Sequence, residues 1–105
     1  METPNLLYIK SLSGGETEFE EKLISIIKNE FPNEKSIYYE HLKAKNYIKA
    51  ADDVHKLKHK ISILGLENSY NLAVDYENNL RENRLNLQND FENVLQIITE
   101  YLSTL

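Results

Sequence analysis

The stretch VHKLKHKISILGL, residues 54–66, sets the helical pattern from which the rest of the chain can be interpreted. Its apolar residues recur at helical spacing and are expected to face a core: Val54, Leu57, Ile61 and Leu64. Gly65 follows directly, and glycine is typical of a helix C-terminus. We therefore predict a helix from about Tyr47 to Leu64 that has one apolar face and one polar face.

Similar apolar stripes on both sides of this stretch predict further helices, and no segment alternates long enough to indicate a strand. Thr3-Pro4 is typical of a helix start, with Thr3 as N-cap. Phe31-Pro32-Asn33 is expected to end one helix and begin the next. The expected helices span, approximately, residues 4–12, 16–31, 33–43, 47–64, 67–83 and 91–105. This pattern, with short connections, predicts an all-α bundle of antiparallel helices.

Length and composition indicate one small domain, residues 1–105. Hydrophobic residues make up 41% of the chain, yet no run approaches the roughly 18 apolar residues of a spanning helix. The first ten residues lack a basic segment followed by an apolar one, so we expect no signal peptide. The chain has no cysteine, which excludes thiolate chemistry and fits a cytoplasmic location. A formal net charge of −5 argues against nucleic-acid binding.

A basic island, defined as His55, Lys56, Lys58, His59 and Lys60, interrupts this acidic chain. Helical geometry places His55 outside the apolar face, towards solvent, and places Lys58 about one turn away. A neutral imidazole is a good nucleophile, and its reference pKa of about 6.5 leaves it mostly unprotonated at pH 7. A nearby ammonium stabilises a phosphoryl group on such a ring. This pattern favours phosphoryl transfer through His55.

The same residues resemble the histidine-containing phosphotransfer (HPt) domain family. His55-Lys56-Leu57-Lys58, with Gly65 ten residues after the histidine, is similar to the family signature of His, any residue, Leu, Lys, Gly and a later second Gly. Three other segments resemble family features as well: Gly14–Phe19, Leu42–Tyr47 and Tyr76-Glu77. The resemblance therefore covers nearly the whole chain.

The resemblance implies an antiparallel four-helix bundle with a short extra N-terminal helix. It implies a phosphorelay intermediate that has no kinase activity and needs no cofactor or metal of its own. We expect the chain to act as a monomer, although the sequence leaves its oligomeric state open. His55 would be the phosphoacceptor and Lys58 would stabilise the phosphoryl group. The implied partners are the receiver domain of a response regulator, which brings its own Mg²⁺, and a hybrid sensor histidine kinase.

We expect a receiver to dock on a surface around His55 formed by Ile48, Ala51, His59, Ser62 and Leu66. One of these residues departs from the family pattern, because His59 stands where the family has the glycine after the lysine. Its imidazole lies one turn from His55 and could crowd a partner, bind the phosphoryl group or restrict which receivers dock. The sequence leaves these three possibilities open.

Other functions remain possible for the same residues. Two histidines at positions i and i+4 can bind a metal ion, but the three lysines among them would repel a cation. Both rings could also be solvated side chains on an exposed helix. Beyond phosphoryl transfer, the chain could be a binding module that docks on a receiver or kinase without accepting phosphate, or a helical adaptor outside phosphorelay.

Overall fold

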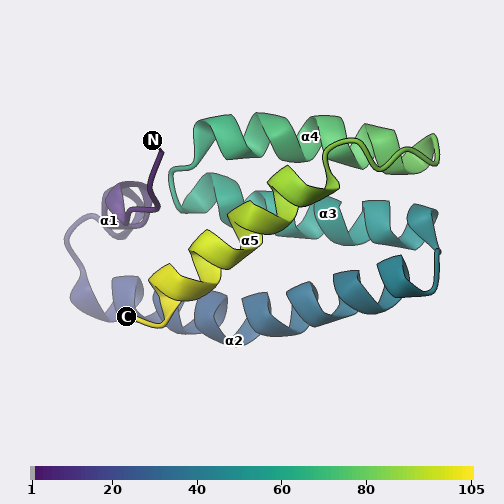
Figure 1. Cartoon of the computed structure of the whole chain (residues 1–105). Helices are drawn as coiled ribbons and strands as arrows, with labels where there is room; N and C mark the ends of the chain where they lie inside the picture. The colour runs from purple at the N-terminus through teal and green to yellow at the C-terminus, as the bar shows by residue number, and fades with distance from the viewer. Residues whose placement is uncertain (1) are drawn as a thin grey trace.

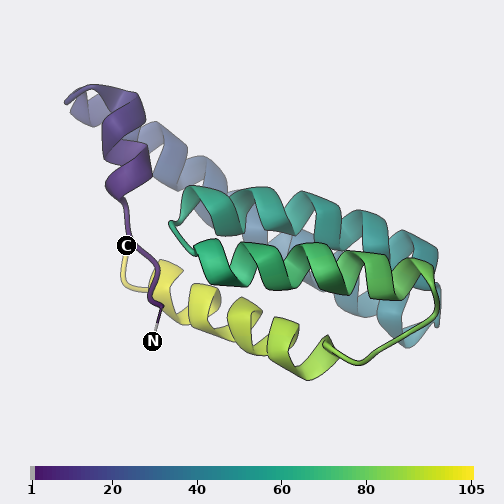
Figure 2. The same cartoon turned by 90° about the horizontal axis from the view of Figure 1, so that it is seen from above.

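The structure, a computed structural model, describes residues 2–105 and is all-helical in that range, which confirms the predicted class. Its elements are α1 (Leu7–Ser13), α2 (Thr17–Lys43), α3 (Tyr47–Ile63), α4 (Glu67–Arg81) and α5 (Gln88–Leu102). α3 packs against both α2 and α4, and successive long helices run in opposite directions (Figure 1). α5 crosses this layer obliquely and contacts α2 and α4 (Figures 1 and 2). None of these helices is long and apolar enough to cross a membrane.

Four aromatic or aliphatic side chains, one from each long helix, anchor a common core: Tyr38, Leu57, Tyr76 and Phe91. All four are fully buried. The ring of Phe91 lies 5.5 Å from that of Tyr38 and 5.0 Å from that of Tyr76, measured between centroids. Such aromatic contacts add about 0.5–1.5 kcal/mol per pair to the stabilisation from burial. The core thus fixes α3 against α2, α4 and α5 and determines which face of α3 meets solvent.

The helix predicted for residues 47–64 is confirmed as α3, together with its apolar face. Its predicted inward residues are fully buried: Val54, Leu57, Ile61 and Leu64. Asn46 caps the N-terminus, because its side-chain oxygen accepts a hydrogen bond from the Lys49 N–H at 3.2 Å. At the other end Gly65 adopts a φ of 78°, and the Leu66 N–H donates to the Ile61 carbonyl at 3.2 Å. Local sequence therefore sets both ends of the helix that carries His55.

The predicted break at Pro32 is wrong, because α2 continues through it from Thr17 to Lys43. Proline has no N–H to donate to the carbonyl of Lys28, a loss that costs about 3 kcal/mol in a helix interior. Phe31 and Tyr38 lie on either side of this point and are both buried in the core. Burying one such side chain stabilises by about 1.5–3 kcal/mol, so the two together outweigh the proline penalty.

The N-terminal helix begins at Leu7 rather than at Pro4, and Thr3 is not its cap. Residues 2–6 instead lie against the turn between α3 and α4 and form hydrogen bonds with it. The Asn5 N–H donates to the Leu64 carbonyl at 2.9 Å, and the Glu2 carboxylate accepts hydrogen bonds from the backbone of Asn68 and Ser69 at 2.7 and 3.0 Å. Because this carboxylate sits at the N-terminus of α4, it satisfies amides that the helix leaves unpaired.

Candidate functional site

His55 lies on the exposed face of α3, as the helical pattern predicts. Its side chain is 51% exposed, whereas its neighbour Val54 is fully buried. Ile48, a predicted docking residue, is 54% exposed, and Ser62 is exposed as well. The imidazole is therefore accessible to another protein, with an apolar and a small side chain on the same helix face.

One edge of the His55 ring is held by Glu77 of α4. The Nδ1 atom of His55 lies 3.3 Å from the Oε1 atom of Glu77. The Glu77 side chain is only 11% exposed, so the carboxylate is fixed between the two helices. Because a carboxylate usually orients an imidazole by accepting from one ring nitrogen, this contact points the other nitrogen of His55, Nε2, away from α4.

Lys58 also contacts Glu77 and is not a free ammonium. Its Nζ atom donates to Oε1 of Glu77 at 3.0 Å, the same oxygen that contacts His55. The Lys58 side chain is 13% exposed and its Nζ lies 6.0 Å from the ring centroid of Tyr70. The predicted closeness of Lys58 to His55 is present, but in this arrangement a shared carboxylate connects the two side chains.

The second oxygen of Glu77 binds a cation of its own helix. Arg81 donates to Oε2 of Glu77 at 3.2 Å and to Oδ1 of Asp52, on α3, at 3.0 Å. Together with Lys56, these residues and His55 line an open depression of about 540 Å³. Arg81 thus links α4 to α3 on the side of Glu77 that Lys58 does not occupy.

These contacts determine the charge of Glu77 and the tautomer of His55. Burial raises the pKa of Glu77, but hydrogen bonds from Lys58, Arg81 and His55 outweigh that effect, so its pKa lies below the usual value. An ionised carboxylate can only accept hydrogen bonds. A neutral His55 in this contact must therefore carry its proton on Nδ1, which leaves a lone pair on Nε2. That atom can act as a nucleophile towards an electrophile that approaches from solvent.

His59 lies beside His55 on the exposed face. The two ring centroids are 5.1 Å apart and the rings meet edge to face at 65°. His59 is exposed, so it borders the path by which a partner would reach His55. Its position is the one expected from helical spacing.

Two of the predicted docking residues are not available to a partner. Ala51 is fully buried and Leu66 is 2% exposed. Ala51 turns towards the core beside Val54, and Leu66 packs into the core just beyond the end of α3. The prediction that they line a docking surface is therefore wrong, and the exposed part of the predicted surface consists of Ile48, His59 and Ser62.

Sequence reasoning missed the two residues that organise the site. Glu77 entered only through a resemblance, and Arg81 did not enter at all. The i, i+4 spacing of Glu77 and Arg81 on one helix was a usable signal for their ion pair. Nothing local indicated that α4 would bring Glu77 against His55, 22 positions earlier.

Other ionisable residues form contacts of their own. Asp52 and Asp53 do not act as a pair, because Asp52 binds Arg81 whereas Asp53 binds Nδ1 of His41 at 2.5 Å. His41 is half-buried. Within residues 2–105, no three His, Cys, Asp or Glu side chains are grouped so that they could hold a metal ion.

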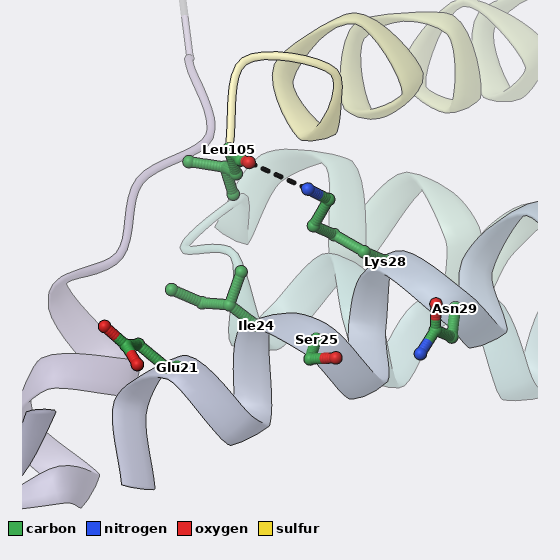
Figure 3. Close-up of a pocket in the computed structure, with 6 residues that line it drawn as sticks. All are labelled: Glu21, Ile24, Ser25, Lys28, Asn29 and Leu105. Carbon is green, nitrogen blue, oxygen red and sulfur yellow. Dashed lines mark hydrogen bonds between the residues drawn. The ribbon is translucent and has the colours of Figure 1, made fainter. Parts of the chain in front are cut away.

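A second depression, of about 430 Å³, lies between α2 and Leu105 (Figure 3). Its lining residues are distant in the sequence from His55 and Glu77. Lys28 donates to the Leu105 carbonyl oxygen at 2.7 Å, so its ammonium is already engaged. Glu21 lies at the opposite end of the depression from Lys28 (Figure 3).

Comparison with known proteins assigns the chain to no family. No family model matches its sequence, no curated protein matches it, and no solved structure matches its fold.

Proposed function

We propose that this protein is a phosphorelay intermediate of the HPt type, in which helices α2–α5 act as an antiparallel four-helix bundle and α1 is an addition to it. His55 would accept a phosphoryl group from the aspartate of one receiver domain and pass it to the aspartate of another. On this proposal the chain is a carrier without kinase activity. Its partners are a response-regulator receiver domain and a hybrid sensor histidine kinase.

One observation carries the proposal: an exposed imidazole whose Nδ1 atom lies 3.3 Å from a largely buried carboxylate, with an ammonium on the same oxygen. The carboxylate orients the ring and supports the positive charge that a reacting imidazole develops. The ammonium is near enough to turn towards a phosphoryl group on the ring. A solvated surface histidine would need neither partner.

The transfer step follows from this tautomer. The Nε2 lone pair of His55 attacks the phosphorus of the receiver's aspartyl phosphate, and an N–P bond forms as the P–O bond to the aspartyl carboxyl breaks. The aspartate leaves as a carboxylate with the bonding electron pair. The proton on Nδ1 of His55 stays hydrogen-bonded to Glu77, which stabilises the positive ring, and the reverse step returns the phosphoryl group to a second receiver.

Docking would use the exposed part of the surface around His55. Ile48 offers apolar contact, Ser62 leaves space, and the basic island attracts the acidic pocket of a receiver. Such charge complementarity raises the association rate more than the affinity. The Mg²⁺ required for transfer would belong to that acidic pocket.

Transfer of label from a phosphorylated receiver tests the proposal. A panel of receiver domains from the same organism is phosphorylated and mixed with wild type, with His55→Gln and, as matched control, with His41→Gln. We expect label on wild type and on His41→Gln and none on His55→Gln. Equal labelling of His55→Gln would show that His55 is not the acceptor.

A binding module that docks without accepting phosphate is the second candidate, because the His59 ring lies 5.1 Å from that of His55 on the approach side. Replacing His59 with glycine separates the two functions. If transfer is near zero in wild type and rises in His59→Gly, the protein is a binding module that His59 blocks. If the substitution changes transfer little, the result supports the carrier. A helical adaptor outside phosphorelay predicts binding to none of the receivers.

A further inference from the structure

In the proposed phosphoryl-transfer site, the Lys58 ammonium is already bound to Glu77 when His55 is unmodified. It is therefore not free to neutralise a phosphoryl group on His55. Its ammonium lies 3.0 Å from Oε1 of Glu77, and its side chain is 13% exposed. A phosphoryl group on Nε2 of His55 would form on the ring edge that faces away from Glu77. Lys58 can neutralise that group only if it leaves Glu77.

Departure of Lys58 would expose Glu77 to a double penalty. Its carboxylate is 11% exposed, and a buried charge that loses its partner is strongly destabilised. The new phosphoryl group would also place further negative charge beyond the His55 ring. Glu77 therefore needs another cation that stays in place while Lys58 moves.

Arg81 meets this need. It binds Oε2 of Glu77, not the oxygen that Lys58 and His55 share, so its bond does not depend on either of them. Asp52 anchors the same guanidinium at 3.0 Å from the other helix. A guanidinium keeps its charge throughout the physiological pH range, so it is suited to this constant role.

We propose that Arg81 is a positioning residue that keeps Glu77 charged and in contact with His55 while Lys58 turns from Glu77 to the phosphoryl group. This inference rests on the proposed function and assigns to the site a moving cation, Lys58, and a fixed one, Arg81. Asp52 holds the fixed cation against α3, three residues before His55 in the sequence.

Two phosphoryl donors and three variants test the proposal. The full-length protein is phosphorylated either by a phosphorylated receiver or by phosphoramidate, a small donor that needs no docking surface. Arg81→Gln removes the fixed charge, Arg81→Lys retains it, and Arg84→Gln is the matched control, because Arg84 pairs only with Glu82 at an exposed position among the residues that the structure describes. Asp52→Asn, at a 61% exposed side chain, weakens the anchor of Arg81 without affecting the core.

Arg81→Gln is expected to slow transfer within the complex about tenfold while the dissociation constant for the receiver stays unchanged, since loss of one charge-assisted hydrogen bond has roughly this effect on a rate. Arg81→Lys should recover much of the rate, and Asp52→Asn should show a smaller loss. Arg84→Gln should match wild type. In a Lys58→Gln background the effect of Arg81→Gln should shrink, because no cation then leaves Glu77.

Each other result contradicts the proposal. If Arg81→Gln transfers at the wild-type rate and wild type is fully active, the role of Arg81 is overturned but the proposed function is not. An equal loss of transfer rate on Arg81→Gln in the presence and absence of Lys58 shows that Arg81 acts independently of the moving cation. This result also overturns the proposal. Failure of wild type to accept phosphate from either donor overturns the proposed function, and this inference with it.

Discussion

At Glu77, three side chains from two helices meet on one carboxylate. His55 and Lys58 share Oε1, and Arg81 occupies Oε2. A buried carboxylate is stable only when such partners compensate its lost hydration, and here they lower its pKa as well. The same bonds that stabilise Glu77 also fix the ring of His55, so stability and the candidate chemistry depend on one residue.

Replacing Glu77 with glutamine should lower the free energy of unfolding by about 2 kcal/mol at pH 7, because hydrogen bonds from charged donors lose their anionic acceptor. The folded-state pKa of Glu77 is depressed, so its contribution is present above about pH 4.5 and is lost as the pH falls through the lower folded value. Urea unfolding of wild type and Glu77→Gln from pH 7 to pH 3 should therefore show a difference in the free energy of unfolding that shrinks on acidification.

The matched control for this prediction is Glu82→Gln. Glu82 pairs with Arg84 at a 64% exposed side chain, and such surface pairs contribute about 0–1 kcal/mol. A stability difference between wild type and Glu77→Gln that stays constant from pH 7 to pH 3 would show that Glu77 is not held as an ionised group.

The helix α3 is the element that carries the site, and its ends are set by local sequence. Asn46 caps its start and Gly65 ends it with a φ of 78°. These signals could be predicted from the sequence because they act within a few residues. The continuation of α2 through Pro32 could not, since it depends on burial of Phe31 and Tyr38 against helices far along the chain.

Gly65→Ala should destabilise the protein more than Gly14→Ala does. Both glycines have positive φ, at 78° and 58°, and an alanine in that region costs about 1 kcal/mol. A Cβ at Gly14 would meet nothing within 4 Å, whereas one at Gly65 would lie 2.6 Å from Nδ2 of Asn5. Chemical denaturation should therefore give a loss of about 1 kcal/mol for Gly14→Ala and a larger loss for Gly65→Ala, because the Asn5 side chain must move.

The extra loss comes from the Asn5 side chain, so it should be reduced when Asn5 is replaced with alanine. A double-mutant cycle of Asn5→Ala and Gly65→Ala measures this coupling. Additive losses in the two substitutions would show that the Asn5 side chain does not obstruct a Cβ at position 65.

At the scale of the whole molecule, one buried polar chain ties three helices together. The Tyr38 hydroxyl of α2 lies 2.7 Å from the Tyr76 hydroxyl of α4 and donates to Glu92 of α5 at 3.0 Å. Burial raises the pKa of Tyr76 to about 12, and burial together with Tyr76 and Glu92 also raises the pKa of Tyr38. Neutral hydroxyls are therefore part of the folded state.

Raised tyrosine pKa values predict alkaline destabilisation. Their contribution is complete below the ordinary pKa of 10 and is lost as the pH rises from 10 towards the folded value of about 12. Tyr38→Phe should lower the free energy of unfolding by about 1–2 kcal/mol at pH 7, because Tyr76 and Glu92 lose a partner. The stability of this variant should also decline less above pH 10. Thermal unfolding against pH measures both effects.

Tyr8→Phe is the control for this prediction, because Tyr8 is 51% exposed. It should follow wild type at every pH. A Tyr38→Phe variant that declines above pH 10 as steeply as wild type would contradict the role of the buried hydroxyls.

Features of this molecule that depend on neighbouring residues could be predicted from the sequence, whereas contacts between residues far apart in the chain could not. Helix type, the apolar face of α3 and the exposure of His55 follow from repeats of three or four residues, so they could be predicted. The contacts of His55 with Glu77 and of Arg81 with Asp52 join positions 22 and 29 apart. They depend on how α3 packs against α4, which no local pattern specifies.

On the proposed function, Nε2 of His55 accepts the phosphoryl group while Nδ1 stays hydrogen-bonded to Glu77. NMR of ¹⁵N-labelled protein phosphorylated with phosphoramidate tests it most directly, through the coupling between phosphorus and the ring nitrogens. We expect this coupling to appear at Nε2 of His55. Coupling at Nδ1 of His55, coupling at His41 or His59 alone, or no phosphorylation of the protein would contradict it.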